Sequence, residues 1–209
     1  MGAAFFPGPA MPSSRSIVLA STSPYRRGLM GRLGVPFEVA APDIDEAALP
    51  GEAPSATATR LAAAKARAVA AAHPDALIVG SDQVADCEGV AISKPGDHAT
   101  ARAQLAAQSG RTIVFHTAVA LYDARTKLLR AELVNVRSTF RVLDTPTIET
   151  YLRRETPYDC AGAVRSESLG IALFESIDSD DPTALIGLPL IALCRLLRAA
   201  GVDVIADGE

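Results

Sequence analysis

The sequence is poor in the residues that build disulfide frameworks and zinc sites. Its 209 residues include only three cysteines and three histidines, and no two cysteines form a C-x-x-C pair. An odd number of widely spaced cysteines argues against a disulfide framework and against a zinc knuckle. We therefore expect a cytoplasmic protein, and a bound cation would be Mg²⁺ or Mn²⁺ held by carboxylates.

Basic runs and long hydrophobic runs are also missing. The net charge is −4 and the pI is near 5.4, so we expect binding neither to nucleic acid nor to a membrane surface. The longest apolar run near the end, residues 184–194, is too short to span a bilayer. No Gly-x-x-x-x-Gly-Lys-Ser/Thr segment is present, which argues against a P-loop kinase or ATPase.

Hydrophobic residues make up 49% of the chain, enough to bury a full core. Residues 1–16 are rich in proline and contain neither a basic start nor a long apolar stretch, so they do not resemble a signal peptide. We expect a disordered tail at residues 1–15 and a single α/β domain at residues 16–209.

Residues 17–33 predict a strand, a tight turn and a helix. The apolar residues 17–19 suit a buried strand, and three small hydroxyl residues end it. Ser23 stands where a helix N-cap belongs, Pro24 where the first helical residue belongs, and Gly34 just past the expected end.

Two cations stand in the first turn of this helix, where the helix dipole disfavours positive charge. Arg26 and Arg27 would be stabilised there by an anion, and the hydroxyls of Ser21 and Ser23 lie beside them. Free backbone N–H groups, hydroxyls and guanidinium groups at a helix N-terminus together predict a phosphate site. The simpler alternative is an ordinary capped helix with solvated arginines.

Two segments farther along carry charges of opposite sign. Residues 42–46 form an acidic, irregular stretch whose carboxylates can bind a cation, although a solvated acidic loop is the simpler explanation because such loops are common. Residues 55–72 predict an alanine-rich helix in which Lys65 shares a stripe with Leu61 and Val69. A lysine on an apolar face either extends to solvent or meets an anionic ligand in a cleft.

Asp82 is the strongest candidate for a catalytic group. It follows the apolar run at residues 76–79, so we place it at the carboxyl end of a central strand, where open α/β sheets bind ligands. A helix cap or turn is the alternative role, but no helical pattern follows. A short strand at residues 90–93 then returns Lys94 to the neighbourhood of Asp82.

The second half of the chain predicts a helix at residues 97–109, a β-hairpin at 112–122 and 128–142, and a helix capped by Thr145 before Pro146. Residues 157–170 are polar, contain glycine and lack periodicity, which favours a binding loop. A strand at residues 171–177, an acidic turn at 178–181 and an amphipathic helix at 188–200 complete the domain.

Several of these segments together resemble the Maf family of nucleotide pyrophosphatases. They are S-T-S-P-Y-R-R, D-I-D-E, R-L-A-A-A-K-A, G-S-D-Q-V, K-P-G, S-G-R, A-G-A and G-L-P-L, in the family's order from residue 17 to about residue 201. The strings Y-D-C-A-G, S-E-S-L-G-I-A-L-F-E and D-D-P-T-A-L-I-G-L-P-L are similar to the branch that hydrolyses 7-methyl-GTP.

The resemblance implies a mixed central β-sheet in two lobes around a cleft, as in Maf and ITPase-like folds. It also implies a homodimer and divalent-metal-dependent hydrolysis of a nucleoside triphosphate to monophosphate and diphosphate. Asp82 is then the proton acceptor, with Glu46 and Asp82 as metal ligands. The other matching positions are Ser21, Arg26, Lys65 and Lys94 in the cleft and Tyr25, Gln83 and Glu167 for base choice.

Two departures bear on base choice. The 7-methyl-GTP branch commonly has a larger aromatic residue where Tyr25 stands, and its usual glycine-serine-phenylalanine-lysine segment reads G-A-V-R at residues 162–165. Two alternatives therefore stay open, a pyrophosphatase for dTTP or UTP and a non-catalytic, nucleotide-sensing regulator of cell division and septum formation.

Overall fold

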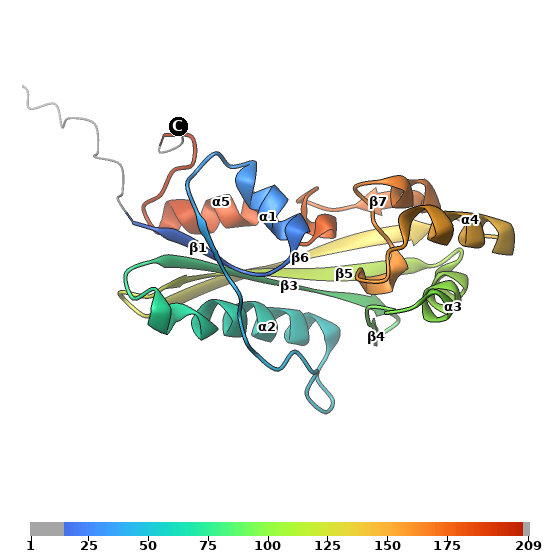
Figure 1. Ribbon diagram of the computed structural model, residues 1–209, viewed down its shortest axis with the longest axis horizontal. Coiled ribbons are helices and arrows are strands. Elements are labelled where there is room, and N and C mark those ends of the chain that lie inside the picture. The colour runs from blue at the N-terminus through green and yellow to red at the C-terminus, as the bar shows by residue number, and fades with distance from the viewer. Residues whose placement is uncertain (1–14, 207–209) are drawn as a thin grey trace, which may run out of the picture.

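Figure 1 shows the computed structural model, which describes residues 15–206. Residues 1–14 of the expected tail lie outside this part. Arg15, the last residue of that expected tail, donates hydrogen bonds of 2.7 and 2.5 Å to the Asp123 carboxylate. In the described residues no helix is long and apolar enough to cross a membrane.

A seven-stranded mixed sheet forms the centre of the molecule, which confirms the expected α/β class. β1 pairs in parallel with β2 and β3, whereas every other pairing is antiparallel. The order across the sheet is β2 (Glu38–Ala40), β1 (Ile17–Ala20), β3 (Leu77–Cys87), β5 (Thr112–Asp123), β6 (Leu128–Phe140) and β7 (Phe174–Asp178), and β4 (Val90–Ile92) pairs with β3.

The helices form two groups at the two ends of the long strands (Figure 1). At one end α2 (Pro54–Ala68) covers one face of the sheet, while α1 (Pro24–Gly31) and α5 (Leu190–Ala199) cover the other. At the opposite end α3 (His98–Gln108) packs against α4 (Thr145–Glu155). Four short 3₁₀ segments lie at Ala70–Ala72, Ala161–Ala163, Leu169–Leu173 and Ala184–Ile186.

The two faces of the sheet are packed differently. The larger core uses bulky side chains such as Leu19, Phe115 and Leu193 beneath α1, α3, α4 and α5. The face under α2 is packed with small residues, among them Ala62 of the helix and Ala118 of β5. Small side chains allow a helix and a sheet to approach closely, so α2 is held nearer to the strands than a leucine-rich helix could be.

Gly80 makes this close approach possible. A Cβ atom at residue 80 would lie 2.2 Å from the Ala62 carbonyl oxygen and 2.7 Å from the Ala66 backbone nitrogen. No other residue type fits there unless α2 moves away from β3. The contact fixes the distance between α2 and β3 at the level where Lys65 and Asp82 face each other.

β3 is longer than the apolar run at residues 76–79 predicts. The prediction that Asp82 ends its strand is wrong, because residues 80–86 continue as β3 and pair with β5, with Asp82 opposite Ala118. The parallel pairing with β1 stops at Gly80 and Ala20. Asp82 therefore lies just beyond the carboxyl end of β1. The strand that ends beside Asp82 is β1, whereas β3 itself continues.

Two other boundaries differ from the expectation. The N-cap of α4 is Asp144, whose carboxylate accepts a 2.9 Å bond from the Thr147 backbone nitrogen, so Thr145 is the first helical residue and not the cap. The segment Leu169–Leu173 is a 3₁₀ helix, and β7 begins only at Phe174. The expected helix starts at Ser23–Pro24 and Asp97 and the hairpin of β5 and β6 are confirmed.

Candidate active site

A cavity of about 540 Å³ opens between the two groups of helices. Its size falls within the range of small-molecule sites, about 300–1,000 Å³. Segments far apart in the sequence line it, from the β1–α1 turn to the turn after Ala184–Ile186. Among the residues expected from the sequence, those that line the cavity are Ser21, Ser23, Tyr25, Arg26, Glu46, Lys65, Asp82, Gln83, Lys94 and Glu167.

Arg27 is the exception among the expected site residues. Its side chain is exposed on α1, and it does not line the cavity. Successive residues on a helix point about 100° apart, and on α1 the residues that line the cavity are Pro24, Tyr25 and Arg26. We therefore leave Arg27 out of the functional proposal.

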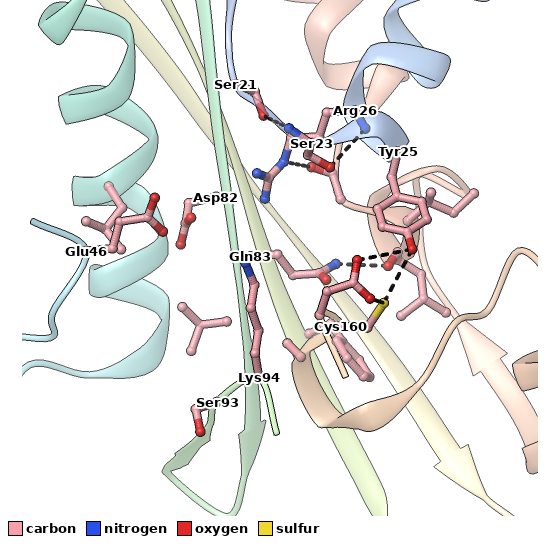
Figure 2. Close-up of a pocket in the computed structure, with 18 of the residues that line it drawn as sticks. Ser21, Ser23, Tyr25, Arg26, Glu46, Asp82, Gln83, Ser93, Lys94 and Cys160 are labelled. Carbon is pink, nitrogen blue, oxygen red and sulfur yellow. Dashed lines mark hydrogen bonds between the residues drawn. The ribbon is translucent and has the colours of Figure 1, made fainter. Parts of the chain in front are cut away.

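The β1–α1 turn presents a helix N-terminus to the cavity (Figure 2). The Ser23 hydroxyl accepts a 3.4 Å bond from the Arg26 backbone nitrogen, and the Ser21 hydroxyl accepts a 3.2 Å bond from the Ser23 nitrogen. The first turn of α1 contains no acidic residue. The positive end of the helix dipole is therefore left for an anionic ligand.

The Arg26 side chain is anchored from the far end of the chain. Its Nε donates a 2.9 Å bond to the Gly187 carbonyl oxygen, which also accepts a 2.9 Å bond from the Ser81 hydroxyl. Burial lowers the pKa of Arg26, while the charges of Asp82 and Glu46 oppose that shift. An arginine remains charged under these conditions, so the guanidinium brings a fixed positive charge to the cavity.

Lys65, Asp82 and Glu46 form the charged centre of the site. The Lys65 Nζ lies 2.7 Å from Asp82 Oδ1 and 3.0 Å from Glu46 Oε1. The side chains of Lys65 and Asp82 are only 5% and 8% exposed, against 53% for Glu46. Burial raises the pKa of Asp82, and the neighbouring Lys65 and Arg26 partly oppose it. A carboxylate with a raised pKa is a better proton acceptor than a solvated one.

The donor set fits a magnesium or manganese ion that arrives with a nucleotide. Among residues 15–206 no group of three or more His, Cys, Asp and Glu side chains is arranged to hold a metal by itself. Mg²⁺ commonly uses one or two protein carboxylates and takes its remaining ligands from phosphate and water. Glu46 and Asp82, on either side of one ammonium group, provide such a pair.

The other end of the cavity carries the aromatic ring of Tyr25 (Figure 2). The Tyr25 hydroxyl lies 3.4 Å from Asp159 Oδ2, and the Arg165 guanidinium carbon is 5.6 Å from the Tyr25 ring centroid. Burial raises the pKa of Tyr25 to about 12 and that of the nearby Cys160 to about 11. Both groups are neutral at pH 7, so the Cys160 thiol is not an activated nucleophile.

Gln83 is oriented by its neighbours. Its amide nitrogen donates a 2.9 Å bond to Thr117 Oγ1 and bonds of 2.9 and 3.0 Å to the carbonyls of Ala184 and Leu185. Two carbonyl acceptors identify this atom as nitrogen and not oxygen. The amide oxygen is therefore the atom with which Gln83 can contact a ligand.

Lys94 and Glu167 complete the rim. Lys94 follows β4, and its side chain points upward toward Gln83 in Figure 2. Glu167 lies in the irregular segment between Ala161–Ala163 and Leu169–Leu173. Both residues are exposed, so each side chain can move toward a bound ligand.

The sequence alone missed the residues at 184–187 that support the site. Four side chains donate to backbone carbonyls of this turn: Arg26, Ser81, Gln83 and Thr117. Gly187 has a φ of +116°, which a glycine adopts without strain. The glycine is visible in the sequence, but the two side chains that donate to its carbonyl oxygen, those of Ser81 and Arg26, lie 106 and 161 residues earlier.

The fold and the cavity define a class of α/β proteins in which a helix N-terminus and basic side chains, suited to an anionic ligand, lie beside a buried acid. The chain belongs to the Maf family: the model of this family, described as "Maf-like protein", matches residues 16–200. The family resemblance inferred from the sequence is thereby confirmed.

Three relatives show how far the similarity extends. The 7-methyl-GTP pyrophosphatase of Albidiferax ferrireducens is 56% identical over 194 residues, covering 93% of this chain and 98% of the relative. The protein of the same name from Polaromonas sp. is 58% identical over 196 residues, 94% of this chain and 90% of the relative. That from Burkholderia pseudomallei is 58% identical over 188 residues, 88% of this chain and 87% of the relative.

Proposed function

We propose that the protein is a nucleoside triphosphate pyrophosphatase that hydrolyses 7-methyl-GTP to 7-methyl-GMP and diphosphate. The observation that carries this proposal is the pairing of buried Lys65 and Asp82 at one end of a cavity that has Tyr25 and Glu167 at the other. The names and the 56–58% identity of the relatives support the same activity and substrate.

Asp82 is the proton acceptor in this proposal. It orients a water molecule toward the α-phosphorus and takes its proton as the water oxygen bonds to phosphorus. The bond from the α-phosphorus to the bridging oxygen breaks in line with the attack, and diphosphate leaves. The raised pKa of Asp82 strengthens it as a base, while Lys65 keeps its carboxylate in place through the 2.7 Å contact.

The phosphate groups are held by the charged end of the cavity. Arg26, Lys65 and Lys94 supply positive charge, and the N-terminus of α1 supplies the positive end of its helix dipole. Glu46 and Asp82 would hold Mg²⁺ or Mn²⁺, which as a Lewis acid stabilises the negative charge on the reacting phosphate oxygens. This local arrangement explains how a chain of net charge −4 can bind a polyanion.

The base would lie at the far end of the cavity. Methylation at position 7 makes guanine cationic, so an aromatic face such as that of Tyr25 attracts it. The Watson–Crick edge of guanine offers N–H donors, for which the Glu167 carboxylate and the Gln83 amide oxygen are acceptors. Uracil and thymine offer one such donor between two carbonyl oxygens, which these acceptors would repel.

A screen of diphosphate release tests the proposal directly. Purified protein would be incubated with Mg²⁺ or Mn²⁺ and with ATP, GTP, 7-methyl-GTP, CTP, UTP and dTTP, and the Asp82→Asn variant would serve as the control for contaminating hydrolases. We expect 7-methyl-GTP to give the highest kcat/KM. Preference for UTP or dTTP would replace the assigned substrate, and no turnover of any nucleotide would favour the non-catalytic regulator.

Three further expectations belong to this proposal. The divalent metal is tested by adding a chelator, which should stop turnover until Mg²⁺ or Mn²⁺ is restored. The homodimer implied by the family resemblance is tested by sedimentation. All three cysteines are free, Cys87, Cys160 and Cys194, which supports a cytoplasmic location.

A further inference from the structure

The loop that carries Glu46 is the least regular part of the site. Residues 41–53, between β2 and α2, contain no helix or strand, and most of their side chains are exposed. Glu46 nevertheless directs its carboxylate to the Lys65 ammonium at 3.0 Å. Holding a carboxylate on an irregular loop in one position costs conformational entropy, so other contacts must restrain the loop.

Arg60 of α2 makes those contacts. Its Nε and one terminal nitrogen each lie 2.7 Å from a different oxygen of Glu52, which is a bidentate pair. The same terminal nitrogen donates a 2.9 Å bond to the carbonyl oxygen of Ala47. Ala47 directly follows Glu46, so Arg60 restrains the backbone next to the carboxylate that faces the cavity.

Glu52 closes the loop from its other side. Its Oε2 atom accepts a 3.0 Å bond from the Leu49 backbone nitrogen and a 3.0 Å bond from the Thr57 hydroxyl. The pair Arg60 and Glu52 therefore joins three loop positions to the first turns of α2. Lys65, farther along the same helix, receives the Glu46 carboxylate, so one rigid element holds the loop and its charged side chain together.

We propose that Arg60 and Glu52 are positioning residues that hold Glu46 in place for the metal and the triphosphate. Neither residue lines the cavity, so both act through the loop and not on the substrate. This inference rests on the proposed pyrophosphatase function, and it assigns a role to two residues outside the reacting groups. A purely structural pair on the surface would stabilise the fold slightly without affecting metal use.

The test compares Arg60→Gln and Glu52→Gln with Arg67→Gln. Arg67 lies on the same helix and is exposed, so its variant removes the same charge from α2 without touching the loop. Three readouts are measured on full-length protein. The first is amide hydrogen exchange of residues 42–50, and the second is Mn²⁺ affinity, followed by electron paramagnetic resonance with the α,β-methylene analogue of GTP present. The third is the Mg²⁺ concentration that gives half-maximal hydrolysis.

In the Arg60→Gln and Glu52→Gln variants we expect exchange in residues 42–50 to be about tenfold faster, as for a loop that opens locally more often. We expect Mn²⁺ affinity to fall about tenfold and the Mg²⁺ concentration for half-maximal hydrolysis to rise by a similar factor. Arg60→Lys keeps the positive charge but loses the planar fork that makes the bidentate pair, so it should give intermediate values. Arg67→Gln should match the wild type in all three measurements.

A double-variant cycle separates positioning from general stability. If Arg60 acts through Glu46, the double variant Arg60→Gln/Glu46→Gln should have the same Mn²⁺ affinity as Glu46→Gln alone. Additive losses would overturn the proposal, as would unchanged exchange in residues 42–50. If the variants exchange faster but depend on metal as the wild type does, Arg60 and Glu52 only stabilise the loop, and the proposed role in metal binding is overturned. A wild type that hydrolyses no nucleotide would instead overturn the proposed function, whatever the exchange shows.

Discussion

The two ends of the cavity are built in different ways. At the phosphate end, Lys65 and Asp82 are nearly buried, lie on α2 and β3 and contact each other at 2.7 Å. At the base end, Glu167 is exposed in an irregular segment, and Tyr25 is partly exposed at the start of α1. Lys65 and Asp82 sit on regular elements in close packing, whereas Tyr25 and Glu167 sit where side chains can vary without disturbing the core.

The difference predicts how each end responds to substitution. Removing one partner of a buried ion pair destabilises the fold, because the remaining charge stays buried without an opposite charge beside it. Removing an exposed group loses only its contact with the ligand, because water replaces the protein partner. Substitutions of the buried pair should therefore affect both turnover and stability, whereas substitutions of exposed groups should affect ligand binding or selectivity and leave stability unchanged.

The largest expected effect is that of Asp82→Asn. The amide keeps the shape of the carboxylate but cannot accept the proton of water, so we expect kcat to fall about 10²–10⁴-fold, with nucleotide affinity within a few-fold of wild type. Single-turnover kinetics and equilibrium binding would measure both. Asp86→Asn, on the same strand but outside the cavity, is the matched control. Retention of more than about a tenth of the turnover would exclude Asp82 as the base.

Next is the contrast between Lys65→Met and Lys94→Met. Lys65 contacts two carboxylates and is buried, so its loss should lower kcat/KM about 100-fold and destabilise the fold by about 3 kcal/mol. Lys94 is exposed, so its loss should raise KM about tenfold and leave the melting temperature unchanged. Steady-state kinetics beside thermal melting distinguish the two. Equal effects on stability would contradict the expected difference between the buried lysine and the exposed one.

A smaller effect is expected at the base end. Glu167→Ala should reduce the preference for 7-methyl-GTP over UTP about 10–100-fold, because the base loses a hydrogen-bond acceptor. Tyr25→Ala should reduce it about fivefold, the size of an exposed cation–π contact. Competing-substrate assays measure the ratio, with exposed Glu175→Ala on β7 as the control. Unchanged selectivity in both variants would place base recognition elsewhere in the cavity.

The smallest effect concerns pH and the loop that carries Glu46. Bonds from Arg60 and the Leu49 backbone lower the pKa of Glu52 from 4.5 to about 2. A lowered pKa in the folded state contributes stability that is present above pH 4.5 and is lost as the pH falls through 2. The difference in denaturation midpoint between wild type and Glu52→Gln should therefore shrink from pH 5 to pH 2. A difference independent of pH would contradict this assignment of the pKa.

Much of the fold could be predicted because it depends on neighbours in the sequence. The turn between β1 and α1 follows from Ser23 and Pro24, since capping bonds join residues two or three positions apart. The hairpin of β5 and β6 follows from two long alternating segments and a short connection. The position of Lys65 on the inward face of α2 follows from helical periodicity, and its burial agrees with that prediction.

The sequence by itself therefore determined most of the helices and strands, the family and a set of candidate residues of which all but Arg27 line one cavity. Only the tertiary structure decided that Asp82 lies in the middle of β3, because β5 continues to pair with that strand after β1 has ended. Only the tertiary structure showed that the Gln83 amide nitrogen is bound by carbonyls at residues 184 and 185, and that Arg60 holds the loop beside Glu46. Local patterns encode periodicity and capping, whereas strand length, side-chain orientation and loop position depend on partners that are distant in the sequence and are brought close only by folding.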